Sequence, residues 1–304
     1  MSESYPWDGQ PRHWRDRAIA WGARRIVQPM LRRPASWKSH RRGFRIAAEL
    51  RFASKPRGLS RRNIMLGDIR ALEISPKAPK RRLLWVHGGG FVVGSPETHF
   101  IMLAHLAHAA EAVVIAPRYR LAPEDPHPRP ATDVEAAARA GFRWRENVGP
   151  FILGGDSAGG CLALVALADM LARDESPAAC VFFSPATIID PDRPVPEADD
   201  LLFPEEILHR IGADYAAGSP AEDPRLSPVK AAFPGAPPTL IQCVNGEYLE
   251  EDSDVMAAHL RGFGTEVSVE KVRRMPHVWQ FMAGSSPLAD DAIRRAAAFI
   301  GTHT

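Results

Sequence analysis

The chain has 304 residues, of which 45% are hydrophobic and 24% are charged, the balance of an ordinary soluble globular protein. No stretch approaches the roughly 20 apolar residues of a membrane-spanning helix, and the first residues lack the continuous apolar segment of a signal peptide. We therefore expect a cytoplasmic protein without a membrane span, built as one large α/β domain with insertions.

The cysteines are few and widely spaced. Cys161, Cys180 and Cys243 are odd in number and lie far apart in the sequence. This spacing predicts neither a disulfide framework nor a CxxC metal site, and three free thiols suit a reducing compartment.

The charge is unevenly distributed. Residues 1–82 carry 21 Lys and Arg against 6 Asp and Glu, although the whole chain has a net charge of only +2. One interpretation is a basic face for anionic lipid or nucleic acid. The other is a basic segment folded against an acidic remainder. We favour the second and expect no nucleic-acid partner, because the arginines occur singly or in pairs with no nucleic-acid-binding motif around them.

Short apolar runs that resemble strands alternate with helical patterns along the chain. The predicted strands cover 69–74, 82–87, 112–118, 151–155, 179–184, 239–244 and 266–272. The predicted helices cover 97–110, 131–146, 157–173, 251–262 and 287–300. Strands that are apolar throughout and alternate with helices indicate a mostly parallel sheet that is covered on both faces.

The N-terminal segment, residues 1–60, does not follow this alternation. It begins with an amphipathic helical stretch, in which Trp14, Ala18, Trp21 and Ile26 fall near one face, and continues as a basic, irregular part. We expect the segment to lie over the end of the sheet where open α/β sheets bind ligands.

A second interruption covers residues 185–238. This segment is rich in proline, and its pattern predicts one short helix near 204–212. We expect it to lie over the same end of the sheet as the N-terminal segment.

The predicted strand 82–87 runs into the sequence HGGGF. Gly88 and Gly89 can expose their amides at the end of the strand, because no side chain covers them. Acyl transfer needs N–H donors of this kind, aimed at the oxyanion of its tetrahedral intermediate. The alternatives are a flexible loop or a phosphate cradle, but the spacing fits neither GxxxxGK[ST] nor GxGxxG. His87 is expected to hold this loop by hydrogen bonding rather than to react.

The sequence GDSAG follows a predicted strand and precedes a predicted helix, the context in which G-x-S-x-G forms a sharp turn. Gly155 and Gly159 leave room for the neighbouring strand and helix, and the strained turn exposes the hydroxyl of Ser157. An isolated match would more often be a plain loop. In this context we predict that Ser157 is a nucleophile and that the amide of Ala158 completes the oxyanion hole. Asp156 is expected to shape the turn and its contacts with a cap.

Five motifs in sequence resemble one known family. They are HGGGF (87–91), YRLAPE (119–124), GDSAG (155–159), DPRLSP (223–228) and MPHVW (275–279). In this order they resemble the hormone-sensitive-lipase-like branch of the α/β-hydrolases, the bacterial group IV esterases.

The resemblance covers roughly residues 68–300. It implies an α/β-hydrolase fold with a helical cap over the active site and no metal or organic cofactor. Residues 1–60 match the N-terminal part of such a cap. Residues 61–304 match the catalytic domain, with a cap insertion at about 185–225. A homodimer is compatible with the sequence.

The general base is expected late in the chain, because this fold orders its triad as serine, acid and histidine. His277 follows the last predicted strand, and we predict that it is the base. His105 and His108 form an HxxH pattern on a predicted helix. No further ligand is spaced to join them, so we interpret them as a polar helix face rather than a zinc site.

The acid departs from the family pattern, which usually places an aspartate directly after the penultimate strand. This chain has the run NGEYLEEDSD, in which Glu247 stands near that position. We predict that Glu247 is the triad acid. Glu250, Glu251 and Asp252 remain alternatives, although carboxylates at the start of a helix usually complement the helix dipole.

Together these features predict a carboxylic ester hydrolase that acts through an acyl-enzyme, with a small-molecule ester as its partner. Short- to medium-chain acyl esters are expected, because the two cap segments would close the pocket and no broad exposed apolar surface is evident. Two alternatives remain: a non-catalytic small-ligand receptor on the same fold, and an amidase, lactonase or peptidase with the same triad. The presence of His277 argues against the receptor, since the plant receptors of this branch have lost that histidine.

Overall fold

The computed structural model describes residues 8–50 and 53–304. Residues 1–7 and 51–52, which belong to the predicted N-terminal part of the cap, lie outside the described residues. Within the described ranges one sheet has the strand order β1-β9-β8-β7-β6-β4-β5-β3-β2. The strands are β1 (Asp8–Gly9), β2 (Ser60–Leu66), β3 (Ile69–Ser75), β4 (Arg81–Val86), β5 (Ala112–Pro117), β6 (Phe151–Asp156), β7 (Ala179–Phe183), β8 (Thr239–Asn245) and β9 (Val267–Arg273).

The pairing of the strands confirms the mostly parallel sheet. Only β2 with β3 and β3 with β5 are antiparallel, and the other neighbours run parallel. All seven predicted strands are present as β3 to β9. The prediction omitted the two-residue β1 and the edge strand β2, most of whose side chains are exposed.

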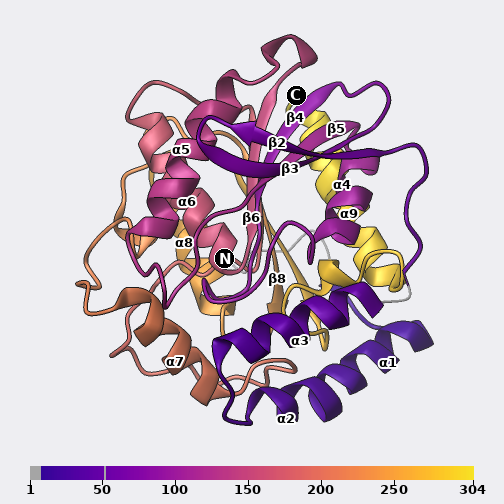
Figure 1. Ribbon diagram of the computed structural model, residues 1–304, viewed down its shortest axis with the longest axis vertical. Coiled ribbons are helices and arrows are strands. Elements are labelled where there is room, and N and C mark those ends of the chain that lie inside the picture. The colour runs from indigo at the N-terminus through magenta and orange to yellow at the C-terminus, as the bar shows by residue number, and fades with distance from the viewer. Residues whose placement is uncertain (1–7, 51–52) are drawn as a thin grey trace.

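Helices cover both faces of the sheet (Figure 1). On one face lie α5 (Arg129–Arg143), α6 (Ala158–Leu171) and α8 (Glu250–Gly262), and on the other lie α4 (Phe100–Ala109) and α9 (Pro287–Thr302). These are the five helices predicted from the sequence. Alternate residues of one strand enter opposite cores: Leu84 and Val86 of β4 belong to one cluster, whereas Leu83 and Trp85 belong to the other. This two-sided burial explains why the strands are apolar throughout.

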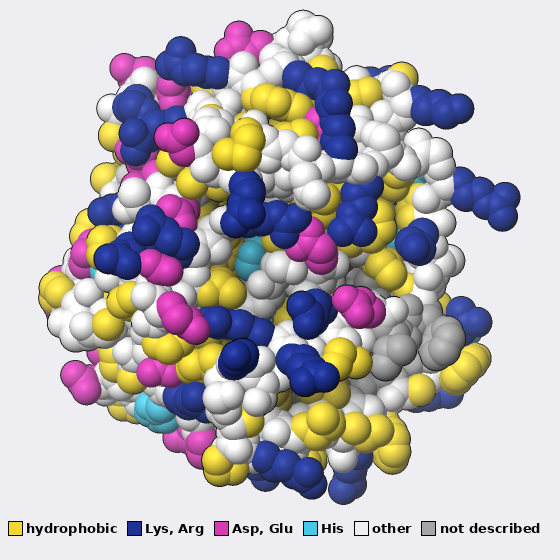
Figure 2. Space-filling view, in the orientation of Figure 1, with side chains coloured by type: hydrophobic (Ala, Val, Ile, Leu, Met, Phe, Trp, Pro, Cys, Tyr) yellow, Lys and Arg dark blue, Asp and Glu magenta, His cyan; other side chains and the backbone are white. Residues whose placement is uncertain are grey.

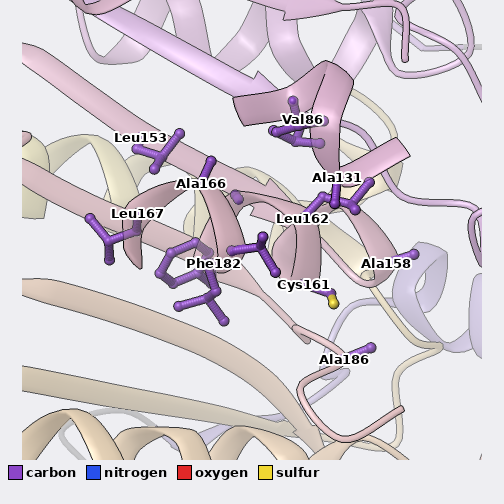
Figure 3. Packing of buried hydrophobic residues seen from close by; sticks show 14 of the residues in the cluster. Val86, Ala131, Leu153, Ala158, Cys161, Leu162, Ala166, Leu167, Phe182 and Ala186 are labelled. Atoms are coloured by element: carbon purple, nitrogen blue, oxygen red, sulfur yellow. The ribbon is translucent and has the colours of Figure 1, made fainter. Parts of the chain in front are cut away.

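Helix α6 packs on the centre of the sheet. Figure 3 shows Leu162, Ala166 and Leu167 of this helix among Leu153 of β6 and Phe182 of β7. All of these side chains are fully buried. The helix that begins directly after the GDSAG turn therefore rests on a close-packed support, which holds the turn rigidly.

The N-terminal segment lies beside the carboxyl ends of the strands (Figure 1). Helix α1 (Trp14–Gly22) continues through a π-helical turn at 23–27 into α2 (Gln28–Leu31), and α3 (Trp37–Leu50) follows. The first helical stretch was predicted from the sequence, but an irregular segment was expected where α3 lies, and that part of the prediction is wrong. Contacts distant in sequence hold α3 in place: Arg41 donates to the carbonyl oxygens of Val92 and Ala122 and pairs with Glu124.

The proline-rich segment contains the predicted short helix as α7 (Glu205–Ala216). This helix contacts the N-terminal segment. The indole N–H of Trp37 in α3 donates to Asp214 of α7, and Arg210 donates to the carbonyl oxygen of Ala35 at 2.7 Å. The two interruptions of the α/β alternation thus meet each other at the carboxyl edge of the sheet, where both were expected.

Two surface predictions need revision. The two tryptophans of α1 do not pack on the body of the protein, because Trp14 and Trp21 are each 62% exposed. An exposed apolar surface is therefore present where none was expected. Acidic partners are found for some of the basic residues, among them Arg24, Arg61 and Lys80, whereas most of those in the range 8–49 form no ion pair with another described residue.

Cys161, Cys180 and Cys243 are buried free thiols. Among the helices of the described residues, none is long and apolar enough to cross a bilayer.

Candidate active site

Ser157 occupies the sharp turn between β6 and α6. Its φ of 53° and ψ of −125° lie outside the regions that ordinary residues favour. The turn is fixed by a hydrogen bond of 2.8 Å from the amide of Ser157 to the carbonyl oxygen of Phe183. A Cβ at Gly155 would lie 2.6 Å from the carbonyl oxygen of Gly159, and one at Gly159 would collide with the carbonyl oxygen of Val86. Both glycines are therefore required by close backbone approach, as the motif predicted.

His277 and Glu247 form a buried pair. Nδ1 of His277 donates to Oε2 of Glu247 over 2.7 Å, and the two side chains are 4% and 1% exposed. The other carboxylate oxygen of Glu247 accepts a hydrogen bond of 2.9 Å from the amide of Val244. Nε2 of His277 is buried and has no hydrogen-bond partner among the described residues. The carboxylate therefore fixes the imidazole with its proton on Nδ1 and leaves Nε2 as an acceptor.

Ser157 does not hydrogen-bond to His277 in this structure. The bond between nucleophile and base commonly tightens only when substrate is bound.

The three alternative acids have other partners. Glu250 accepts from Asn245, from the amide of Gly246 and from Lys271. Glu251 pairs with Arg193, and its side chain is 57% exposed. Asp252 is buried and accepts from the amides of Thr187 and Ile188 and from Arg193. None of the three hydrogen-bonds to His277 or forms an ion pair with it, so the geometry favours Glu247.

Two further residues near His277 carried no sequence signal. The ring of Phe203 lies 5.0 Å from the imidazole, measured between centroids. Asp200 is buried and accepts hydrogen bonds from the amides of Leu202 and Phe203 at 2.7 and 2.8 Å, which holds the segment that carries this ring. Burial, with the nearby charge of Glu247, raises the pKa of Asp200. Both belong to the proline-rich segment, and only the fold brings them to the histidine.

The charged groups around His277 raise its pKa. Burial alone would lower the pKa of His277, but the charge and hydrogen bond of Glu247, together with the charges of Asp200 and Asp156, outweigh burial. The pKa of His277 is therefore raised above its ordinary value. A site of this kind stabilises the imidazolium that forms when a nucleophile is deprotonated.

One predicted oxyanion donor in the glycine loop after β4 needs correction. The amide of Gly88 donates to Oδ2 of Asp156 at 3.0 Å, so this N–H is directed at a buried carboxylate and not at the pocket. The amides of Gly89 and Gly90 donate no hydrogen bond within the described part of the chain. Gly90 lines the same pocket as Ser157 and Ala158. The amides of Gly89 and Gly90 are therefore the available donors of this loop, whereas the sequence suggested Gly88 and Gly89.

Asp156 organises the back of the site. In addition to Gly88 it accepts from the indole of Trp85 at 2.8 Å and from Nε2 of His99 at 3.2 Å. Burial opposes its charge, but His99 and these hydrogen bonds hold the pKa of Asp156 below its ordinary value. The carboxylate therefore shapes the turn, as expected, by tying β4 and β6 together. No motif in the sequence pointed to His99.

His87 holds the glycine loop, as predicted. Its Nδ1 donates to the carbonyl oxygen of Gly88 at 2.9 Å, and the hydroxyl of Tyr119, from the YRLAPE motif, donates to the carbonyl oxygen of His87 at 2.7 Å. Burial lowers the pKa of His87 to about 3, so this imidazole is neutral. His105 of the HxxH pattern donates from Nε2 to the carbonyl oxygen of Ser54. Within the described ranges, no cluster of three potential metal ligands is present.

The DPRLSP motif stabilises the proline-rich segment. Asp223 accepts from His127 at 3.0 Å and from the amide of Arg225 at 2.8 Å. Ser227 accepts from the amide of Ile189 at 2.9 Å. These contacts attach the segment to the body beside the pocket, and none of them reaches Ser157.

A pocket of about 130 Å³ opens next to Ser157. Its walls come from the glycine loop, the start of α6, the segment 186–196, α7 and the loop after β8. Most of the lining side chains are apolar, among them Ile188, Val195, Phe203 and Ile211. An apolar cavity of about 150 Å³ holds a molecule the size of benzene. This pocket therefore accommodates an apolar group of about that size beside the serine hydroxyl.

Comparisons with known proteins agree with this geometry. A family described as the alpha/beta hydrolase fold matches residues 83–281, a range that contains Ser157, Glu247 and His277. An acetyl-hydrolase of Streptomyces hygroscopicus is 35% identical over 230 residues, which cover 74% of this chain and 76% of the relative. The carboxylesterase NlhH of Mycobacterium tuberculosis is 30% identical over 230 residues, which cover 71% of this chain and 72% of the relative.

Solved structures resemble the whole fold. The crystal structure of an esterase from the bacterial hormone-sensitive lipase family superposes with a TM-score of 0.85 at 28% identity, covering 95% of this chain and 98% of that one. A hormone-sensitive lipase from a metagenome library superposes with a TM-score of 0.82 at 28% identity, covering 98% of this chain and all of the other. The similarity therefore includes the N-terminal and proline-rich segments as well as the sheet.

Proposed function

This chain belongs to the alpha/beta hydrolase family, in the branch of bacterial hormone-sensitive-lipase-like esterases, and on that premise we propose that it is a serine carboxylesterase with the triad Ser157, His277 and Glu247. The observation that carries the proposal is the buried hydrogen bond of 2.7 Å between His277 and Glu247, which leaves Nε2 of His277 as the free acceptor. Ser157, on its strained turn, supplies the hydroxyl.

The reaction has two halves that use the same groups. His277 takes the proton of the Ser157 hydroxyl at Nε2 while Oγ attacks the carbonyl carbon of the ester. It then gives that proton to the departing alcohol, which leaves an acyl-enzyme. Water, deprotonated by His277 in turn, attacks the acyl-enzyme; the bond between the acyl carbon and Oγ of Ser157 then breaks, and His277 returns the proton to Oγ as the carboxylic acid is released. Glu247 holds the imidazole and offsets its positive charge in both halves.

The oxyanion is proposed to bind to the amides of Gly89, Gly90 and Ala158. Ala158 is the first residue of α6, so its N–H has no partner within the helix, and the positive end of the helix dipole adds to the stabilisation. Loss of one donor from such a hole typically costs about a hundred- to a thousandfold in kcat.

The proposed substrates are esters with short- to medium-chain acyl groups. The pocket of about 130 Å³ matches a small acyl group, and residues of α7 line it together with Gly90 of the glycine loop. Ile211 of α7 meets Gly90 so closely that a Cβ on this glycine would lie 2.7 Å from the Ile211 side chain. We assign residues 1–60 and about 185–225 to a cap over the catalytic domain 61–304. A cytoplasmic location and a homodimer remain predictions.

A series of p-nitrophenyl esters of increasing acyl length tests the proposal. We expect kcat/KM to be highest for acyl groups of about the size that the pocket holds and to fall steeply beyond it. Ser157→Ala, run in parallel, separates enzymatic turnover from background hydrolysis. A rate that rises steadily into long acyl chains would contradict the assigned substrate class. A wild-type enzyme no faster than Ser157→Ala on every ester and on the matching anilides and lactones would instead favour a non-catalytic receptor.

A further inference from the structure

The first helical segment, residues 14–31, carries a concentration of exposed apolar side chains. In the described part of the chain eight large hydrophobic side chains are exposed, and five of them lie in this segment. They are Trp14, Trp21, Ile26, Val27 and Met30. Figure 2 shows hydrophobic side chains gathered along the lower edge of the molecule, where Figure 1 places α1 and α2. Scattered exposed hydrophobic residues are normal, whereas a contiguous group marks an interaction site.

The opposite face of α1 explains why the tryptophans point outward. Asp16 is buried and accepts a hydrogen bond of 2.6 Å from the hydroxyl of Ser286, the N-cap residue of α9. A carboxylate at this position also complements the positive end of the α9 dipole. Ile19 packs against the neighbouring apolar cluster. At about 100° per residue, Asp16 and Ile19 lie on the face of α1 opposite Trp14 and Trp21. A polar contact therefore sets the rotation of the helix.

Basic residues are concentrated in the same part of the chain. Residues 8–49 contain eleven Lys and Arg against three Asp and Glu, and one of the three acids is the buried Asp16. Arg24 and Arg41 pair with Asp199 and Glu124. Within the described residues the remaining nine are exposed and form no ion pair. They are Arg12, Arg15, Arg17, Arg25, Arg32, Arg33, Lys38, Arg42 and Arg45.

We propose that the outer face of residues 14–31, with these nine basic residues, docks the protein on an anionic lipid surface. Tryptophan prefers the headgroup level of a bilayer, and aliphatic side chains beside it enter the acyl boundary. The basic side chains are attracted by acidic headgroups within about a Debye length. Exposed Trp, Ile, Val and Met side chains together with Arg and Lys side chains that form no ion pair are typical of a helix that lies in a membrane interface.

The charge argues against the other occupants of this face. A second copy of the chain would bring two strongly basic surfaces together across a two-fold axis, which like-charge repulsion disfavours. A nucleic acid would satisfy the cations, but it offers no acyl region for Ile26, Val27 and Met30. Of these three occupants, the anionic lipid surface alone satisfies both the charge and the aliphatic side chains.

The docking face is also close to the active site. The side-chain amide of Gln28, in α2, donates to the carbonyl oxygens of Asp200 and Phe203 at 2.9 and 3.3 Å. Phe203 in turn lies against His277. An ester that partitions into the same lipid would thus be held near the pocket. This last consequence rests on the proposed function, whereas the docking itself does not.

Vesicle sedimentation with the full chain tests the proposal. Bound fractions are measured with vesicles of phosphatidylcholine alone and of phosphatidylcholine mixed equally with phosphatidylglycerol, at low and high salt. The test variant combines Trp14→Ser with Trp21→Ser. The matched control combines Met65→Ser with Phe263→Ser, which removes two hydrophobic side chains, 57% and 39% exposed, outside the segment. Melting temperatures confirm that both variants are folded.

We expect the wild type to bind the anionic vesicles, to bind more weakly as salt rises, and to bind neutral vesicles poorly. The tryptophan variant should lose roughly tenfold or more in partition coefficient, and the control less than about twofold. Absence of binding to anionic vesicles at low salt would overturn the proposal. So would equal losses in the two variants, or a wild-type dimer that dissociates only in the tryptophan variant. Turnover of a soluble ester is measured separately, so that failure of docking and failure of catalysis remain distinguishable.

Discussion

Replacement of Glu247 by glutamine tests the most specific feature of the site. Glutamine has the same shape as glutamate but carries an amide in place of one carboxylate oxygen. Its single oxygen is needed by the amide of Val244, which donates to Glu247 over 2.9 Å. The NH₂ group then faces Nδ1 of His277, where the wild-type carboxylate accepts over 2.7 Å. Nδ1 must become an acceptor, which moves the imidazole proton to Nε2.

The magnitude follows from this tautomer. A histidine that carries its proton on Nε2 cannot accept the proton of Ser157. The corresponding substitution in a serine protease lowers kcat about ten-thousandfold, which corresponds to about 5.4 kcal/mol in the activation free energy. If the glutamine instead turned its oxygen toward His277, the buried amide of Val244 would lose its acceptor, at a cost of about 1–3 kcal/mol in stability. The first arrangement should therefore dominate.

The assay compares Glu247→Gln with Glu251→Gln on p-nitrophenyl butyrate, with melting temperatures for both. Glu251 is the matched control, because its side chain is 57% exposed and pairs with Arg193 instead of His277. We expect Glu247→Gln to be folded and almost inactive, and Glu251→Gln to keep its kcat within about twofold, as for an exposed ion pair. A Glu247→Gln enzyme with near-normal kcat beside an inactive Glu251→Gln would refute the assignment and move the acid downstream.

Three further predictions concern pH, the turn and the pocket. The pKa of His277 is raised above 6.5, and the base must be neutral to act, so kcat/KM should fall as the pH drops through a value above 6.5. A midpoint below 6.5 in the pH–rate profile would contradict this. Gly159→Ala should destabilise the fold by about 3 kcal/mol in urea unfolding, because its methyl group meets immobile backbone. The control is Gly43→Ala, which has open space around it and should be neutral or stabilising by up to about 1 kcal/mol. Equal changes in the free energy of unfolding for the two variants would be evidence against a collision at Gly159. Ile211→Ala should enlarge the pocket and shift the ratio of kcat/KM toward longer acyl chains by about tenfold, and an unchanged ratio would place the acyl group elsewhere.

The sequence predicted those parts of the fold whose signals are local. Central strands are buried on both faces and therefore read as apolar runs, and the helices between them show clear periodicity. Edge strand β2 carries Arg61 and Arg62 on mostly exposed positions and lacks that signal. Helix α3 is amphipathic but rich in Lys and Arg, so its sequence resembled an irregular basic segment, and its place depends on partners far along the chain, such as the carbonyl oxygens of Val92 and Ala122 that accept from Arg41. Tertiary contacts of this kind override local propensity.

The same distinction applies to the site. The surroundings of Ser157 follow from a five-residue motif in a strand–turn–helix context, and the hydrogen bond between His277 and Glu247 joins the two residues that chain order suggested. The catalytic roles of all three remain predictions. The sequence could not reveal that Asp156 takes the amide of Gly88, since that contact depends on how β4 and β6 lie side by side. Nor could it reveal that α1 turns Trp14 and Trp21 outward, because this orientation depends on the hydrogen bond between Asp16 and Ser286.

Covalent labelling tests the central claim, that Ser157 is the nucleophile of this enzyme, most directly. The full chain is treated with diethyl p-nitrophenyl phosphate, and the intact protein and its peptides are weighed by mass spectrometry while ester turnover is followed. We expect one diethylphosphoryl group per chain, on the peptide that contains Ser157, with turnover lost in proportion to labelling. Ser157→Ala should remain unlabelled and should turn over esters about a millionfold more slowly than the wild type. A label on another residue, or a Ser157→Ala enzyme that keeps substantial turnover, would contradict the account.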